Sequence, residues 1–209
     1  MSPEIRMIQR GRARNLQESG SSKNVKHRIL LLGIGNTLHG DDGVGYCLAY
    51  GIKYCGGIEG ADIATIQELN PGHITMLDGY ETVVFIDAYI SDDMPESARI
   101  AVLELDPSRL REDEVVALVQ EMDPHSLNPI RLMILSYAAQ LFKGRAYLIG
   151  IKPYRIEFSG GLSKDIKKAL PQALEELRRI LAKLGANMKA DINCVINWVD
   201  RNCDKPLLD

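Results

Sequence analysis

The sequence predicts a single three-layer α/β domain, with a twisted and mainly parallel sheet of about five strands and helices on both faces. Two observations favour this fold class. Short aliphatic runs typical of buried strands alternate along the chain with segments of helical periodicity. One such run, Ile29 to Leu32, leads through a glycine-rich loop into a helix, which is the opening half of a βαβ unit.

After this first strand and helix, the pattern continues with a second strand near Asp62 and a short helix over His73 to Leu77. The clearest buried strand is the continuous apolar run from Glu81 to Tyr89. The next strand, Ala98 to Leu105, follows a short connection without a helix. We therefore expect it to lie antiparallel at the edge of the sheet.

The second half of the chain predicts a helix from Leu127 to Leu141 and a last core strand from Ala146 to Ile151. A regular stripe of leucine and isoleucine predicts a final helix from Leu162 to Leu184. Pro171 should kink this helix or mark a restart, and Gly185 fits its C-terminal cap.

Composition separates this domain from its two ends. Residues 1–26 are basic and lack periodicity, which predicts a flexible arm. Residues 27–186 form the α/β domain, which is long enough to bury a sizeable core. Residues 187–209 form a tail whose apolar spacing around Trp198 predicts a short helix that docks on the domain or on a partner.

Charge and hydropathy exclude several classes of function. The net charge of −3 argues against nucleic acid as the principal partner. No apolar run is long enough to span a bilayer, and the N-terminus lacks the apolar segment of a secretory signal. We therefore expect a cytoplasmic protein without a membrane span, and leave its oligomeric state open.

The four cysteines show no Cys-x-x-Cys spacing, so neither a zinc ribbon nor a thioredoxin-type motif is indicated. Cys47 and Cys55 lie two turns apart on the first helix, where we expect them to pack as small hydrophobic residues. Cys194 and Cys203 could pair if the organism tolerates intracellular disulfides. We expect free thiols.

The glycine loop, residues 33–45, is the first candidate site. It contains half of a dinucleotide fingerprint, but two aspartates stand where a pyrophosphate would lie, and no P-loop lysine follows. Asp41 is placed to cap the following helix, with Asp42 in its first turn. Asp42 could bind a cation or activate a water. The alternative is that both acids are ordinary helix caps.

Two further residues could join Asp42. Asp87 ends a buried strand, where a carboxylate is costly unless it is paired or bound to a metal. The C-terminal ends of strands are also where open α/β sheets bind ligands. His125 lies near the start of a helix, where a lone histidine is usually a surface residue. Imidazole is nevertheless a common ligand of transition metals.

Three segments in this order resemble the hydrogenase maturation endopeptidases, which trim the large subunit of nickel-iron hydrogenases. The segments are G-x-G-N-x-L-x-x-D-D-G-x-G (33–45), I-D-A (86–88) and P-H-x-L (124–127). A weaker match, P-x-A-L-E (171–175), lies in the final helix. The likeness covers about residues 28–185 and leaves both ends of the chain outside it.

The resemblance implies that Asp42, Asp87 and His125 are metal ligands. The metal would be nickel that the substrate already carries, with zinc or manganese as surrogates in vitro. The family often has glutamate at the first position, so Asp42 reaches one methylene less far. Asp42 and Asp87 would be catalytic, with Asp87 as the candidate general base.

The reaction that the resemblance implies is removal of a C-terminal extension from the nickel-loaded precursor of the hydrogenase large subunit. Predicted substrate contacts are Gly35, Asn36, Asp41 and Glu68. The last lies in a segment that departs from the Gly-rich acidic pattern common in the family. No Ser-His-Asp or Cys-His order indicates a covalent nucleophile. The alternatives are a non-catalytic chaperone that senses nickel in the large subunit, a different small-molecule hydrolase on a similar sheet, and an α/β domain whose acids only cap helices.

Overall fold

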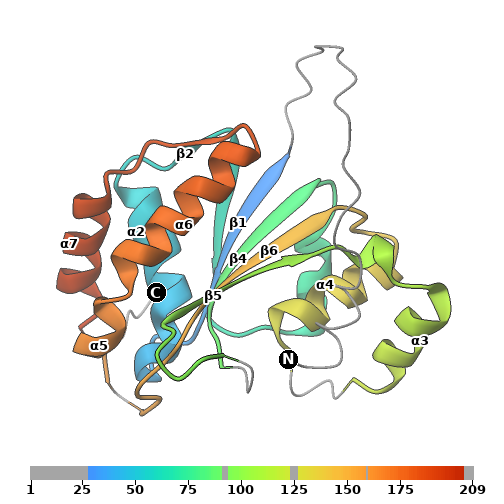
Figure 1. The fold of residues 1–209 in the computed structure, drawn as a ribbon, viewed down its shortest axis with the longest axis horizontal. Helices are drawn as coiled ribbons and strands as arrows, with labels where there is room; N and C mark the ends of the chain where they lie inside the picture. Colours follow the sequence, from blue (N-terminus) through green and yellow to red (C-terminus); the bar gives the residue numbers. More distant parts are fainter. Residues whose placement is uncertain (1–27, 91–93, 123–126, 159, 205–209) are drawn as a thin grey trace.

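A computed structural model describes residues 28–90, 94–122, 127–158 and 160–204 (Figure 1). The predicted basic arm, residues 1–26, therefore lies outside the described residues.

The central sheet has five strands in the order β3-β1-β4-β6-β5 (Figure 1). Its first four strands are parallel, and β5 pairs antiparallel with β6 at the edge. The strands are β1 (Ile29–Ile34), β3 (Ala61–Ile66), β4 (Thr82–Ala88), β5 (Ile100–Leu105) and β6 (Arg145–Ile151). The predicted fold class is confirmed, including the antiparallel edge strand.

Alternation along the strands divides the core into two layers. Leu31 and Val84 contribute to one apolar cluster, whereas Leu32 and Phe85 contribute to the other. The first layer is covered by α2 (Val44–Tyr54), α5 (Lys164–Lys167), α6 (Leu170–Lys183) and α7 (Ile192–Asn202). The second is covered by η2 (Pro71–Leu77), α3 (Glu112–Gln120) and α4 (Pro129–Ala138). Figure 1 shows these two groups of helices on opposite sides of the sheet.

Local signals set the ends of several helices. Pro171 lies in the first turn of α6 and separates it from α5, so the predicted restart is confirmed. Gly185 follows α6 with a φ of 77°, as its predicted capping role requires. Asn128 caps α4 by accepting a 2.9 Å hydrogen bond from the backbone N–H of Arg131.

The C-terminal tail is part of the same domain. Asn187–Met188 (β7) pairs antiparallel with Ile58–Glu59 (β2), a small ribbon that the sequence did not predict. The predicted tail helix is present as α7, which packs against α2. None of the helices in the described part of the chain combines the length and apolar character that a bilayer crossing requires.

The expectation of free thiols is wrong, because the cysteines form two disulfides between α2 and the tail. Cys47 pairs with Cys203, and Cys55 with Cys194. The Cys194–Cys203 pair considered from the sequence does not form. Disulfides persist in oxidising compartments and also in intracellular proteins of hyperthermophiles. The cytoplasmic location therefore stays a prediction.

Close packing between α2 and α7 explains this pairing. A Cβ atom on Gly51 would lie 3.1 Å from the Trp198 ring and 3.3 Å from a methyl group of Val195, so glycine allows the helices to approach. The Trp198 ring also stacks on Tyr50, with 5.3 Å between ring centroids. The tail therefore covers α2 through buried apolar contacts as well as through the disulfides.

We expect the Cys55–Cys194 disulfide to contribute about 2–5 kcal/mol to the free energy of unfolding, because it joins residues 139 positions apart in sequence. Replacing both cysteines by alanine should lower the stability by this amount in urea titrations. Strong reductant should lower the free energy of unfolding of the wild-type protein by at least this amount, because it opens both disulfides. The same reductant should lower that of the variant by less, because only Cys47–Cys203 remains. Identical melting of the wild-type protein with and without reductant would contradict this assignment.

Candidate active site

The candidate site lies at the edge of the sheet where the parallel strands end, the lower edge in Figure 1. β1 leads at Gly35 into the glycine loop, β3 leads to Glu68, and Asp87 lies near the end of β4. Gly33 pairs with Ile86, so Asp87 lies level with the start of the glycine loop. The fold thus brings the two segments that carry Asp42 and Asp87 to one edge.

Glycines allow the loop to lie directly on the strand ends. Gly35 has a φ of 140°, and a Cβ atom there would lie 1.8 Å from the carbonyl oxygen of Asp42. A Cβ atom on Gly45 would lie 2.0 Å from the carbonyl oxygen of Ile86. The short turn η1 (Gly40–Gly43) and the start of α2 are therefore held against β1 and β4.

The half-buried carboxylate of Asp42 is oriented by the loop itself. Its Oδ2 accepts a 2.9 Å hydrogen bond from the backbone N–H of Asn36. The side chain of Asn36 in turn accepts a 2.9 Å hydrogen bond from the N–H of Leu38. Gly35 and Asn36, predicted to contact substrate, thus shape the loop that positions Asp42. Asp42 itself lies in η1, one residue before the N-cap of α2, Gly43.

Asp87 is in an environment that opposes its ionisation. Burial at the strand end raises the pKa of its carboxyl group well above the ordinary value, and the negative charge of Asp42 raises it further. A hydrogen bond from the Ala88 backbone acts in the opposite direction. Two carboxylates that repel each other in a partly buried place suit a divalent cation, because a cation removes both penalties.

Asp41 has a different role from the one predicted. It does not cap the helix, and its side chain has no exposed surface with which to contact a substrate. Its Oδ2 accepts hydrogen bonds from the backbone N–H groups of Tyr154 (2.8 Å) and Arg155 (2.9 Å). Ser163 donates from its backbone N–H to Oδ1 (2.6 Å) and from its hydroxyl to Oδ2 (2.8 Å). Asp41 therefore ties the glycine loop to the segment after β6.

Ser163 is the partner that the sequence did not reveal. Its hydroxyl also accepts a 3.1 Å hydrogen bond from the N–H of Ile166 and so caps α5. A serine three residues before an apolar position is a recognisable helix-start signal. Its bond to Asp41, 122 residues away, has no local signature.

Glu68 and His125 are the remaining predicted site residues. Glu68 is exposed in the bend that follows β3, at the same edge of the sheet. His125 lies outside the described residues. Within the ranges that the structure describes, no group of three histidine, cysteine or acidic side chains is close enough to hold a metal ion. The ligand set of Asp42, Asp87 and His125 therefore stays a prediction. The structure places two of its members, Asp42 and Asp87, at the same edge of the sheet.

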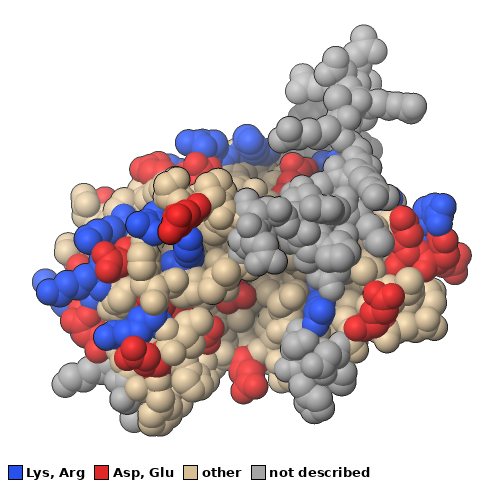
Figure 2. All heavy atoms as spheres, turned by 60° about the horizontal axis from the view of Figure 1, so that its bottom comes forward, with Lys and Arg blue, Asp and Glu red and all other residues tan. Residues whose placement is uncertain are grey.

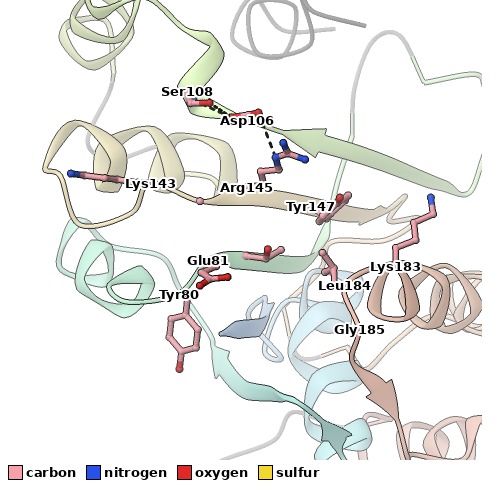
Figure 3. A pocket seen from close by; sticks show the side chains of 12 residues that line it. Tyr80, Glu81, Asp106, Ser108, Lys143, Arg145, Tyr147, Lys183, Leu184 and Gly185 are labelled. Carbon is pink, nitrogen blue, oxygen red and sulfur yellow. Dashed lines mark hydrogen bonds and ion pairs between the residues drawn. The ribbon is translucent and has the colours of Figure 1, made fainter. Parts of the chain in front are cut away.

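A separate hollow of about 730 Å³ lies at the opposite edge of the sheet, beside the starts of β4 and β6 (Figure 3). Within it, Asp106 accepts a hydrogen bond from Ser108 and lies 3.7 Å from the guanidinium of Arg145. Asp106 is thus paired with a cation, whereas Asp87 at the other edge faces the like charge of Asp42, so we place the site at the C-terminal edge.

Charge on the described surface is mixed. In Figure 2, which brings the lower edge of Figure 1 forward, lysine and arginine are interspersed with acidic side chains over the left part of the molecule. The first turn of α3 carries Glu112, Asp113 and Glu114. This distribution differs from the basic stripe that typifies a nucleic-acid interface.

Several solved structures are similar to this chain in fold. A hydrogenase 2 maturation peptidase from a Thaumarchaeota archaeon is 26% identical, with a TM-score of 0.53 over 76% of this chain and 98% of that one. The hydrogenase maturating endopeptidase HybD from E. coli is 20% identical, with a TM-score of 0.60 over 77% and 95%. This chain has the fold of the hydrogenase maturation endopeptidases. The resemblance predicted from the sequence is thereby confirmed.

The likeness spans nearly the whole of these maturation endopeptidases but leaves about a quarter of this chain outside it. A maturation protease HycI from Thermococcus kodakarensis is 21% identical, with a TM-score of 0.51 over 76% of this chain and 92% of that one. No protein-family model and no curated protein matches the sequence.

Replacing Asp41 by asparagine should destabilise the protein by about 2–4 kcal/mol, because an amide NH₂ would face donors that now share a buried carboxylate. Urea unfolding at neutral pH measures this loss. Asp165→Asn is the control, since Asp165 is exposed and forms a surface ion pair with Lys168. Equal stability of the Asp41→Asn variant and the wild-type protein would show that the bonds from Ser163 and the 154–155 backbone contribute little.

Replacing Asp87 by asparagine should stabilise the metal-free protein at neutral pH. The folded state raises the pKa of Asp87 above 3.8, so its contribution to stability is present below pH 3.8 and is lost as the pH rises through the raised pKa. The variant should therefore melt higher than the wild-type protein at pH 7, by roughly 2–4 °C for each 1 kcal/mol relieved.

The advantage of Asp87→Asn should disappear near pH 4. Thermal melts in a metal chelator at both pH values test this. Asp113→Asn is a control of opposite sign, because a hydrogen bond from Arg111 lowers the pKa of that carboxyl group. A lower melting temperature of Asp87→Asn at pH 7 would show that ionised Asp87 is stabilised in the folded state.

Proposed function

We propose that this chain is an endopeptidase that removes a C-terminal extension from the nickel-loaded precursor of a nickel-iron hydrogenase large subunit. The observation that carries the proposal is the convergence of Asp42 and Asp87 at one edge of a sheet with the maturation-endopeptidase fold. Fold alone does not define an activity, so the carboxylate pair is the necessary second argument.

In this proposal the metal arrives as part of the substrate. Carboxylate oxygens are suitable ligands for a divalent cation, and an imidazole from His125 would add a donor that nickel and zinc favour. The mutual repulsion of Asp42 and Asp87 would make the apo site receptive to a cation that a precursor presents. Zinc or manganese would serve as surrogates in vitro.

Asn36, Asp42 and Asp87 would then have separate roles in peptide hydrolysis. Nickel presented by the precursor would polarise a bound carbonyl or water. The backbone N–H of Asn36 fixes the orientation of the Asp42 carboxylate, which would hold the metal. Asp87 takes the proton of the attacking water as the new C–O bond forms, and returns it to the leaving amine as the C–N bond breaks. In the metal-free protein, burial raises the pKa of Asp87, which makes its carboxylate a stronger base than that of an exposed aspartate.

The test is a processing assay with purified precursor, with and without inserted nickel, and mass spectrometry of the product. The wild-type protein should release a C-terminal peptide from the nickel-loaded precursor alone. Asp87→Asn should reduce the rate at least about 100-fold, because general-base catalysis typically contributes 10²–10⁴-fold. Asp113→Asn, which removes an exposed carboxylate on α3, should process at the wild-type rate.

Other outcomes distinguish the alternatives. A stable complex of wild-type protein and precursor without any released peptide would favour a chaperone that senses nickel. Wild-type rates for Asp87→Asn would remove the general-base role, and release of the peptide from nickel-free precursor would remove the requirement for metal.

A further inference from the structure

The segment after β6 exposes three large apolar side chains close together in sequence. Tyr154, Ile156 and Phe158 have exposed fractions of 41%, 56% and 73%, and we refer to them as the apolar row. Isolated exposed apolar side chains are common, but a concentration of them typically marks a binding surface.

The polar residues between them are occupied with local contacts. The guanidinium of Arg155 lies 3.9 Å from the carboxylate of Glu157, and it also donates a 3.3 Å hydrogen bond to the carbonyl oxygen of Gly161. The polar side chains of this segment thus contact each other and the loop backbone, whereas the three apolar side chains remain exposed. The apolar row is therefore the part of this segment that is open to a binding partner.

The apolar row is joined by its backbone to the turn that carries Asp42. Asp41, the neighbour of Asp42, accepts hydrogen bonds from the N–H groups of Tyr154 and Arg155, and its own N–H donates to the carbonyl oxygen of Arg155 (2.9 Å). The ring of Phe158 lies 6.0 Å from the ring of His39, two residues before Asp41. These contacts hold the apolar row beside the glycine loop.

The neighbouring strand brings apolar surface to the other carboxylate. β6 lies next to β4, and Gly150 pairs with Asp87, so the apolar row begins four residues beyond that pair. Ile90, three residues after Asp87, is 65% exposed. Exposed apolar side chains thus follow both of these adjacent strands at the edge that carries the carboxylates.

We propose that the apolar row binds apolar side chains of the polypeptide substrate beside its scissile segment and determines which precursor the enzyme accepts. This inference rests on the proposed function. The occupant is a segment of the precursor beside its scissile bond, because the hydrogen bonds of Asp41 hold the row next to the turn that carries Asp42.

The test compares Ile156→Ser/Phe158→Ser with Val116→Ser. Val116 is a matched control because it is 49% exposed on α3, away from the site. The double substitution leaves intact the backbone groups that bond to Asp41. With nickel-loaded precursor, the double variant should show at least a tenfold increase in KM and less than a twofold change in kcat, since the lost contacts act in binding. Val116→Ser should retain both constants.

Binding measured by calorimetry separates the two proposals. In an Asp87→Asn background, the double substitution should weaken the Kd for the precursor at least tenfold. An unchanged KM and Kd, with Asp87→Asn inactive, would overturn the role of the apolar row and leave the peptidase function standing. Wild-type protein that binds the precursor without cleaving it would overturn the peptidase function, and the Kd would still decide the role of the row. Absence of both binding and cleavage would overturn both.

Discussion

The buried carboxylate of Asp41 holds together the two loops on which the site depends. It takes hydrogen bonds from two backbone groups of the segment after β6 and from both polar groups of Ser163. A charged group without solvent is unfavourable unless such bonds replace its hydration, so these partners must be in place in the folded state. Through these bonds, this one side chain fixes the turn that carries Asp42 to the segment that carries Tyr154.

Asp42 and Asp87 destabilise the metal-free fold, whereas Asp41 stabilises it. The glycine loop places them near each other at the sheet edge, where burial and mutual repulsion raise the pKa of Asp87. Locally unfavourable arrangements of this kind are typical of functional sites, because the penalty is removed when the ligand binds. Asp41 and Asp42 are adjacent in sequence, yet one is structural and the other is exposed to the site.

The tail provides a second constraint on the same helix. α7 covers α2 through Gly51, Val195 and Trp198, and two disulfides fix it there. Because α2 begins directly after the turn that carries Asp42, the tail supports the helix that follows the site. Asp41 therefore fixes the glycine loop to the segment after β6, and the tail fixes α2, the helix that follows this loop.

Local sequence patterns determined the elements and the place of the carboxylates. Aliphatic runs predicted the strands, the missing crossover helix predicted the antiparallel edge strand β5, and Pro171 predicted the restart before α6. Asp42 and Asp87 were found because carboxylates after parallel strands meet at one sheet edge. These features depend on short-range periodicity and backbone chemistry, which a single sequence contains.

Only the tertiary structure decided which distant residues pair. Asp41 was misassigned because Ser163 lies 122 positions away, and the cysteines because their partners lie 139 and 156 positions away. The apolar row was missed because an irregular loop has no periodicity to show which side chains remain exposed. Composition and spacing describe neighbours along the chain, whereas hydrogen bonds, disulfides and exposure depend on contacts that form when separate segments pack together.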